Sequence, residues 1–356
     1  MMKQDEFPRP AWLALRTPHA RVSIRLDRRL PLVVAALLPA LLLALVISVS
    51  YGEFHIGYLD VMKAVMVMGM DTGDSRHALV VQNFRLPRIL LALLIGVALA
   101  VSGTIIQGVT RNDLADPGLL GINAGAGVLV VGYLTLATVP DTRLLPWLAL
   151  AGGLGAALLI YLMTWKGGSS TLRLVLLGVG VSAFGAALIN YFITRLEVDS
   201  AQRAFVWLTG SVYGSTWADV RLLAVWAALL IPPTVLMARH LNVLGLGDDA
   251  AASLGLRVEI TRLMLIAISA ALAAVTVTVA GTIAFAGLVA PHIARRLVGP
   301  AHEGLLLVSA LVGGLLLVVA DLAARAVIAP EELPIGVTIA LIGGPFFAWL
   351  LYKRGR

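Results

Sequence analysis

Side chains that could carry out catalysis or bind a metal ion are few in this chain and widely spaced. The six histidines are scattered, and no H-E-x-x-H zinc motif occurs. Residues 180–184 read G-V-S-A-F and so lack the final glycine of a G-x-S-x-G nucleophile elbow. The chain has no cysteine, which excludes disulfides and thiolate chemistry. We therefore expect neither a catalytic residue nor a bound metal ion.

Two arginines, Arg85 and Arg88, flank a Leu-Pro pair just ahead of a long apolar run. A guanidinium presents a planar fork of N–H donors that matches a carboxylate, so such a pair could hold acidic groups of a partner. Proline is tolerated in the first turn of a helix, where its missing N–H costs nothing. The spacing predicts a helix that begins near residue 86 with two cations at its start.

A polar turn is predicted in residues 110–127, which read T-R-N-D-L-A-D-P-G-L-L-G-I-N-A-G-A-G. Asn, Asp, Pro and Gly at this density are typical of a tight irregular turn. The G-x-x-x-G spacing that follows predicts a smooth helix face for close packing. The residues of this turn and packing motif are Arg111, Asn112, Asp116, Pro117, Gly121, Asn123 and Gly125. Nothing in the motif indicates catalysis.

A second polar segment, residues 245–256, reads G-L-G-D-D-A-A-A-S-L-G-L. Asp248 or Asp249 could cap the start of a short helix, the alanines favour it, and Gly255 could end it. A short helix of small residues can press into a cleft on a soluble partner; the alternative is a simple connector. The residues assigned to this coupling segment, within about 239–262, are Leu246, Gly247, Asp248, Asp249, Ala252, Leu254 and Gly255.

The composition indicates that these segments are held by helices in a lipid bilayer. Hydrophobic residues make up 59% of the 356 residues, and only 13% are charged, about half the charged fraction of a soluble domain. The 35 glycines suit close helix approach in lipid. The net charge of +7 could suggest nucleic acid. However, no basic face with aromatics and no recognition helix occurs, so we expect no nucleic-acid partner.

A bilayer span needs roughly 20 apolar residues, and the sequence predicts an all-α polytopic membrane protein with about ten transmembrane helices. A single crossing over 263–293 would place Arg295 and Arg296 outside, so the positive-inside tendency favours a break at Gly281. Both termini are then cytoplasmic. The predicted spans are about 32–50, 86–109, 124–139, 144–165, 174–194, 220–237, 263–280, 283–293, 304–323 and 335–352.

This orientation places Arg85 and Arg88 on the non-cytoplasmic side, against the charge tendency. One explanation is anchoring to lipid headgroups by snorkelling side chains. The other is docking of an outside protein that bears carboxylates. The sequence alone leaves both explanations open.

An energy source for transport is absent from the chain. No G-x-x-x-x-G-K-[ST] phosphate-binding loop occurs, and residues 166–170, K-G-G-S-S, have suitable types in the wrong order. The predicted spans carry almost no ionisable residues at mid-membrane depth, where an ion-coupled secondary transporter usually keeps them. An ion-coupled transporter and an intramembrane enzyme are therefore the less favoured classes.

Six motifs in order carry a resemblance to a known family. They are R-L-P-R at 85–88, the 110–126 segment, W-L-T-G-S at 207–211, G-D-D-A-A-A-S-L-G at 247–255, G-L-V-A-P-H-I-A-R-R at 287–296 and E-L-P-I-G-V at 332–337. Over about residues 32–356 the chain resembles the permeases of iron-siderophore, haem and vitamin B12 ABC importers. One departure is Asp113, where the family more often has proline.

The resemblance implies a fold like that of the vitamin B12 importer permease and a complex with two copies of an ABC ATPase subunit. A second permease, identical or homologous, and a periplasmic or lipoprotein substrate-binding protein complete that complex. ATP and Mg²⁺ would bind to the ATPase, and this chain would bind no cofactor. By matching motif, Arg85, Arg88 and Arg325 would dock the binding protein, and Ser170 and Thr171 would form the cytoplasmic gate.

The remaining expectations concern the substrate, the location and the N-terminal segment. The resemblance favours an iron(III)-siderophore chelate as substrate and the bacterial inner membrane as location, with haem and cobalamin as alternative cargoes. Residues 1–30 are basic and lack a cleavage site, so we expect a cytoplasmic tail attracted to anionic membrane lipid, followed by one membrane domain over 31–356.

Overall fold

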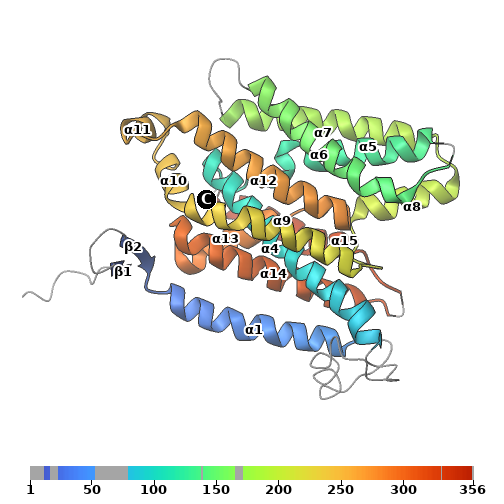
Figure 1. The fold of residues 1–356 in the computed structure, drawn as a ribbon, viewed down its shortest axis with the longest axis horizontal. Helices are drawn as coiled ribbons and strands as arrows, with labels where there is room; N and C mark the ends of the chain where they lie inside the picture. Colours follow the sequence, from blue (N-terminus) through green and yellow to red (C-terminus); the bar gives the residue numbers. More distant parts are fainter. Residues whose placement is uncertain are drawn as a thin grey trace, which may run out of the picture.

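Long apolar helices make up most of the chain and run lengthwise through the molecule (Figure 1). The structure is a computed structural model, and it describes residues 12–16, 23–52, 79–137, 139–164, 171–329 and 331–354. In chain order the elements are β1 (Trp12–Arg16), β2 (Ser23–Asp27), α1 (Leu30–Ser50), η1 (Val81–Arg85), α4 (Leu86–Thr110), η2 (Pro117–Leu120), α5 (Ile122–Leu136), η3 (Thr142–Leu144), α6 (Leu145–Thr164), α7 (Thr171–Ile193), α8 (Val198–Thr209), α9 (Trp217–Leu236), α10 (Ala238–Leu244), α11 (Asp248–Ser253), α12 (Val258–Ala280), α13 (Ala286–Val298), α14 (His302–Ala326) and α15 (Ile335–Arg354).

The polytopic all-α fold predicted from the sequence is confirmed. Within the described ranges, 8 helices are long and apolar enough to cross a membrane, and α5 is a shorter apolar helix. They coincide with nine of the predicted spans because each span is an uninterrupted run of apolar residues, which can satisfy its backbone groups in lipid only by forming a helix. The chain is therefore a multi-pass membrane protein.

The tenth predicted span, 283–293, differs from the structure. The break at Gly281 is present, with φ of +70° there and +65° at Phe285, so the chain leaves helical geometry between α12 and α13. The helix that follows, α13, has 13 residues. Its length is about 20 Å, less than the roughly 30 Å of a hydrocarbon core. The chain nevertheless crosses the bundle between the end of α12 and the start of α14, with residues 281–285 as a non-helical entry and α13 as a short helix.

Three further features were not predicted. The helix of the second span begins earlier than residue 86, because a π-helical turn, η1, precedes α4 without a break. The connection over 195–219 contains a helix, α8, which is amphipathic rather than apolar. Residues 12–27 include an antiparallel hairpin that pairs Trp12 with Asp27 and Arg16 with Ser23.

The centre of the bundle is formed by α4, packed against α12, α13 and α14. In its most apolar stretch 78% of the η1–α4 residues are buried, compared with 17% for α7. Glycines allow this close approach: a Cβ added to Gly103 would lie 1.7 Å from the carbonyl oxygen of Gly287 in α13. Small residues let the helix backbones touch, which is how helices associate in lipid.

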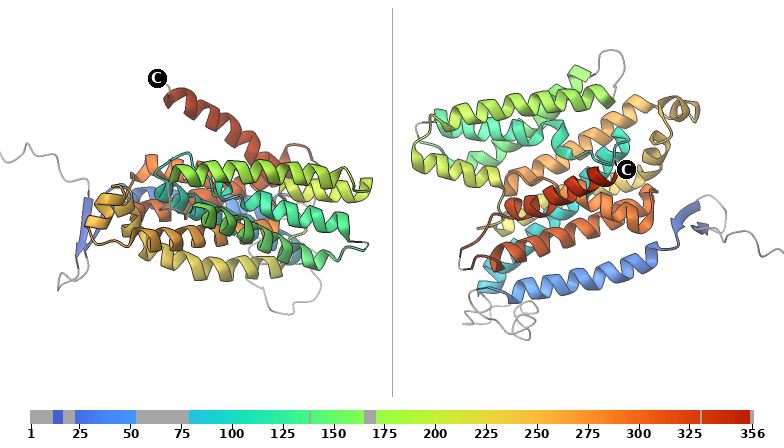
Figure 2. Two further views of the ribbon diagram at one scale, coloured as in Figure 1. Left: turned by 90° about the horizontal axis from the view of Figure 1, so that it is seen from above. Right: turned by 180° about the vertical axis from the view of Figure 1, so that it is seen from behind.

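The helices at the two edges have fewer neighbours. Helix α1 lies along one side of the bundle, next to α14 (Figure 1). Helix α15 packs near its start, where the amide of Gly336 donates to the carbonyl of Gly210, and then leaves the bundle at an angle (Figure 2). Long helical faces on α1, α7 and α15 therefore remain exposed.

Candidate functional sites at the two ends of the bundle

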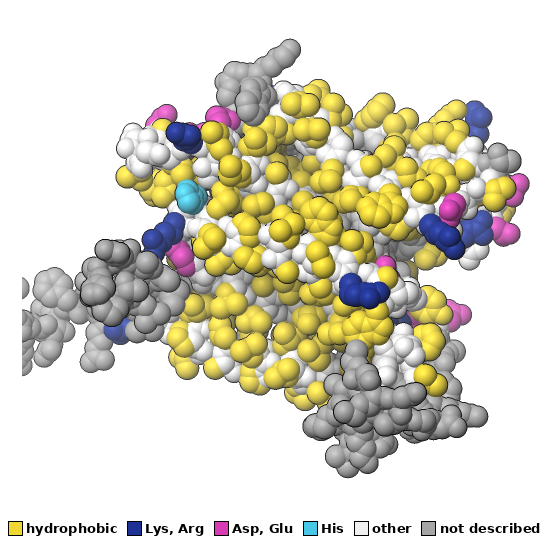
Figure 3. Space-filling view, viewed as in Figure 1, with side chains coloured by type: hydrophobic (Ala, Val, Ile, Leu, Met, Phe, Trp, Pro, Cys, Tyr) yellow, Lys and Arg dark blue, Asp and Glu magenta, His cyan; other side chains and the backbone are white. Residues whose placement is uncertain are grey.

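Charged side chains gather toward the two ends of the bundle, and the face between them is mainly hydrophobic (Figure 3). We call the end that carries α10 and α11 the α11 end. The opposite end, which carries α8 and the start of α4, is the α8 end (Figure 1). The predicted docking arginines lie at the α8 end, and the predicted coupling segment lies at the α11 end.

At the α8 end two of the three predicted docking arginines, Arg88 and Arg325, share one carboxylate, that of Asp321. Arg88 Nε donates to Asp321 Oδ1 at 2.8 Å, and Arg88 Nη1 donates to Glu332 Oε2 at 2.7 Å. Arg325 Nε lies 3.1 Å from Asp321 Oδ2. The Asp321 side chain is only 1% exposed, so its carboxylate attracts both guanidinium groups with little screening by water.

Two of these arginines also hold the end of α1. Arg85 Nη1 donates to the carbonyl of Val49 at 2.7 Å, and Arg325 Nη1 donates to the carbonyls of Tyr51 at 2.9 Å and Ser48 at 3.2 Å. The last carbonyls of a helix have no partner within the helix. The guanidinium groups supply those partners and match the partial negative charge of the helix end.

The three predicted docking arginines are largely buried in the structure. Arg85 and Arg325 are each 8% exposed, and the Arg88 side chain is 13% exposed. Their acceptors are α1 carbonyls and the carboxylates of Asp321 and Glu332, most of them far away in the sequence. The arginines therefore fasten α1, α4 and α14 together, and their part in docking stays a prediction.

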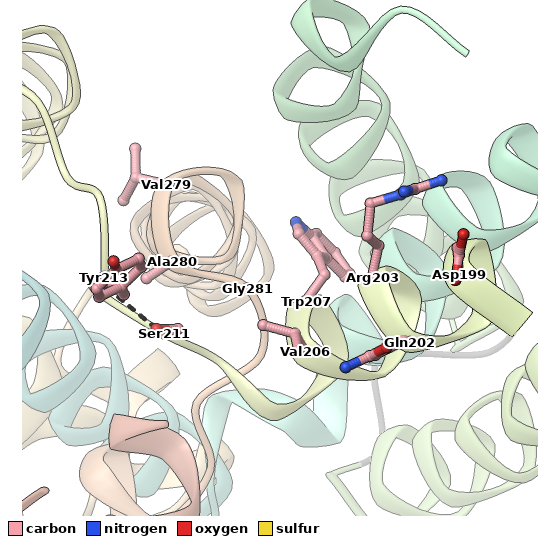
Figure 4. A pocket seen from close by; sticks show the side chains of 10 residues that line it. All are labelled: Asp199, Gln202, Arg203, Val206, Trp207, Ser211, Tyr213, Val279, Ala280 and Gly281. Atoms are coloured by element: carbon pink, nitrogen blue, oxygen red, sulfur yellow. Dashed lines mark hydrogen bonds between the residues drawn. The ribbon is translucent and has the colours of Figure 1, made fainter. Parts of the chain in front are cut away.

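The α8 end also carries a hollow that sequence reasoning missed. It has a volume of about 600 Å³ and lies between α8, the turn after it and the end of α12. Figure 4 shows Arg203 and Trp207 on α8 at one side, with Ser211 and Tyr213 at the other. The W-L-T-G-S motif forms the end of α8, and Gly210, with φ of +73°, turns the chain into the hollow. In the sequence, only the W-L-T-G-S motif indicated that the chain turns after α8.

At the α11 end the predicted turn forms as expected between α4 and α5. Asn112 Oδ1 accepts from the amide of Leu114 at 3.0 Å, and Asp116 Oδ1 accepts from the amide of Gly118 at 2.8 Å. Pro117 then opens the short helix η2. Burial raises the pKa of Asp116 to about 6, although the Gly118 hydrogen bond acts in the opposite direction.

The two glycines of this motif have different roles. Gly125 packs as predicted, because a Cβ there would lie 2.2 Å from the carbonyl oxygen of Gly152 in α6. Gly121 instead has φ of +68° and ends η2, so it serves the turn rather than the helix face. Asn123 lies in the first turn of α5, beside Gly118.

A short helix, α11, forms where the sequence predicted one, but its cap differs from the prediction, and its role in coupling stays a prediction. Its N-cap is Gly247, with φ of +108° and no side-chain hydrogen bond, whereas Asp248 and Asp249 lie inside the first turn. They match the positive partial charge of the helix start there. Gly255, with φ of +83°, follows the helix as predicted. Ala252 lies on the helix itself.

Asp248 ties α11 to the bundle. It pairs with Arg111, which has φ of +51° at the end of α4, and with Arg262 of α12 at 2.8 Å. Leu246 and Leu254, on either side of α11, are each 65% exposed. Leu246 and Leu254 therefore lie exposed beyond the end of the bundle, on either side of a helix that the Asp248 ion pairs hold in position.

The predicted gate lies mostly beyond what the structure describes. Ser170 is outside the described residues, and Thr171 is the first residue of α7, with its side chain also outside them. Across the described ranges, no three His, Asp or Glu side chains cluster as a metal site would require.

Known proteins with the same organisation are permeases. The family model described as the FecCD transport family matches residues 40–353. The iron(3+)-hydroxamate import system permease protein FhuG of Bacillus subtilis is 41% identical over 318 residues, covering 87% of this chain and 94% of that protein. The ferric enterobactin transport system permease protein FepG of Escherichia coli is 37% identical, with coverage of 94% and 99%.

A solved structure has the same fold. It is described as an inward-facing conformation of a metal-chelate type ABC transporter, and it matches with a TM-score of 0.80 at 29% identity, covering 91% of this chain and 99% of that one. The family match and the relatives cover well over half of the chain. The relatives are named for transport and not for catalysis. This chain belongs to the FecCD transport family.

Proposed function

We propose that this chain is the permease subunit of an ATP-driven importer that moves an iron(III)-siderophore chelate across the bacterial inner membrane. The observation that carries the proposal is the nearly full-length similarity to permeases of iron(3+)-hydroxamate and ferric enterobactin import. The eight long apolar helices supply the membrane path. Haem and cobalamin are the alternative cargoes.

In this proposal the α11 end faces the cytoplasm, together with both termini, and the α8 end faces outward. The basic N-terminal segment and the arginines of α13 then lie inside, in line with the positive-inside tendency. Two ATPase subunits bind at the α11 end, and they hold the ATP and Mg²⁺. A second permease, identical or homologous, completes the membrane core.

The contact with the ATPase is assigned to α11 and its flanking leucines. Leu246 and Leu254 would enter an apolar cleft on the ATPase, because their burial there would remove exposed apolar surface from water. The ion pairs of Asp248 would keep α11 in the orientation that the cleft requires. The flanking leucines of α11 are thus exposed to a partner, while the ion pairs hold the helix in one orientation.

The contact with the substrate-binding protein is assigned to the α8 end. Arg88 is the best-placed of the three predicted arginines, because its partner Glu332 is 33% exposed at the side chain and can give way to a carboxylate of the incoming protein. Arg85 and Arg325 support this surface by fixing α1 beneath it.

Co-expression with the cognate ATPase and uptake of a radiolabelled ferric siderophore test the proposal. We expect the ATPase to copurify, and we expect uptake to require ATP and to stop when the ATPase carries a substitution of its phosphate-binding lysine. Growth on single iron sources then identifies the cargo. Uptake that persists without the ATPase but stops with a proton ionophore would contradict the proposal.

A further inference from the structure

A single side chain joins α10 to the beginning of α14. The amide oxygen of Asn242 accepts a hydrogen bond from the backbone N–H of His302 at 3.0 Å and from its Nδ1–H at 2.7 Å. The amide nitrogen of Asn242 donates to Glu303 Oε2 at 2.7 Å. We call Asn242, His302 and Glu303 the α10 clamp. The Asn242 amide thus forms three hydrogen bonds to the start of α14, two at its oxygen and one at its nitrogen.

The clamp also rests against α4. His302 is 6% exposed, and a Cβ added to Gly108 would lie 2.8 Å from His302 Nε2 and 3.0 Å from Leu241 Cδ2 of α10. Gly108 is thus a point where α4, α10 and α14 touch, at the edge of a hollow of about 520 Å³ that Leu241, Asn242 and His302 also line. Because the three helices touch directly here and are joined by the Asn242 hydrogen bonds, a displacement of α10 would be passed on to α4 and α14.

Helices α4 and α14 remain joined along the rest of their length. A Cβ added to Gly96 would lie 2.1 Å from the carbonyl oxygen of Gly313, so the two backbones touch. Farther along, Arg88 of α4 pairs with Asp321 of α14 at 2.8 Å. The pair extends from the α10 clamp to the arginines at the α8 end (Figure 1).

The attachment of α11 is different in kind. Its ion pairs all pass through Asp248, whose side chain is 46% exposed. The pair with Arg111 is exposed and is therefore screened by salt, whereas the pair with Arg262 joins Asp248 to a side chain that is only 3% exposed. A force applied to α11 would therefore reach the centre of the bundle by two routes, through the short turn to α10 and through the short turn and the Arg262 pair to α12.

We propose that the α10 clamp is one contact that transmits the motion of the ATPase into the bundle, in addition to the Arg262 pair of α12. Asn242, His302 and Glu303 act as positioning residues that make α10 move as one body with α4 and α14. This inference rests on the proposed function, because it requires an ATPase at the α11 end. It assigns transmission to residues outside the exposed coupling helix itself.

Substitutions that exchange the amide of Asn242 and the carboxylate of Glu303 test the clamp in the assembled importer. Asn242→Asp keeps the acceptor for His302 but places a carboxylate against Glu303. Glu303→Gln alone keeps an acceptor for Asn242 and is the matched control. The double variant, Asn242→Asp with Glu303→Gln, restores every hydrogen bond; donor and acceptor are exchanged only in the bond between positions 242 and 303, and the bonds from His302 keep their direction.

The measurement is substrate transported per ATP hydrolysed in proteoliposomes with the loaded binding protein, together with thermal stability. We expect Asn242→Asp to lower this ratio about tenfold, a typical size for coupling between sites, and the double variant to restore it. An unchanged ratio, or a loss of thermal stability with no change in the ratio, would overturn the inference. Failure of the wild-type chain to copurify with any ATPase would instead reject the proposed function.

Discussion

Replacement of Asp321 is the most direct test of the arginine cluster. This carboxylate receives Arg88 and Arg325 at 2.8 and 3.1 Å, and its side chain is 1% exposed. Asp321→Ala would leave two guanidinium groups in a buried position without their shared counter-charge. Asp321→Asn keeps the shape and one acceptor oxygen but removes the charge.

The expected magnitude follows from what the arginines retain. Removing one partner of a buried ion pair costs about 3–5 kcal/mol. Here Arg88 keeps Glu332, and Arg325 keeps the carbonyls of Ser48 and Tyr51. We therefore expect Asp321→Ala to lower the free energy of unfolding by about 3 kcal/mol, the lower part of that range. The Asn variant should lie between Ala and wild type.

Glu332→Ala is the matched control, because it removes a carboxylate from the same arginine at a side chain that is 33% exposed. We expect a loss of about 1 kcal/mol or less, as for other solvent-exposed pairs. The assay is SDS-induced unfolding of the purified chain in mixed micelles, followed by tryptophan fluorescence. Equal losses for the two variants, or an Asp321→Ala loss below about 1 kcal/mol, would refute the buried-network reasoning.

Three other predictions follow from the structure. Asp248→Ala should weaken coupling of transport to ATP hydrolysis severalfold, whereas Asp249→Ala should have little effect, because only Asp248 forms the ion pairs that orient α11; the transport-to-hydrolysis ratio measures both. Gly103→Ala should prevent stable folding, since its Cβ would lie 1.7 Å from a carbonyl oxygen of α13, whereas Gly155→Ala should be neutral in the same unfolding assay because nothing lies within 4 Å. Asp116 has a pKa raised to about 6 from 3.8, so the folded state holds its proton more tightly and stability should fall as the pH rises from 3.8 to about 6; Asp116→Asn, which keeps the acceptor oxygen, should flatten the pH profile of unfolding.

The membrane helices could be predicted from the sequence because their signal is local. Each long span is an apolar run of span length, and lipid leaves such a run no backbone arrangement except a helix. The break at Gly281 was also readable, since charge placement required it. The short α13 was harder to predict, because its start depends on the close contact of Gly287 with α4 rather than on hydropathy.

The burial and the partners of the arginines could not be predicted, because those partners are distant in the sequence. Arg325 binds carbonyls of α1 that lie more than 270 residues earlier. Arg88 binds Asp321, 233 residues away. The sequence places each arginine at a helix end, but only the packing of α1 and α14 on α4 shows that the charges are buried.

The α10 clamp could not be predicted from the sequence either, because it also depends on tertiary packing. Asn242 is one polar residue in a segment where polar residues are common, and His302 had no partner that spacing could suggest. Gly108 lies within an ordinary run of small and apolar residues. The contact exists because α10 turns back onto α14, and turns of this kind are specified by tertiary packing.

The distribution of charge also bears on how the protein is driven. Along the described helices with span length, Asp, Glu, Lys and Arg lie near the helix ends, and Arg88, Arg325 and Arg262 there have carboxylate partners. A proton-coupled carrier needs an ionisable group that gains and loses its proton at mid-membrane depth as access alternates. Groups held in ion pairs at a helix end are poorly suited to that task, because their partners stabilise one charged state. The free energy for transport is therefore better supplied at the α11 end, where the exposed leucines and the clamp lie, than within the bilayer.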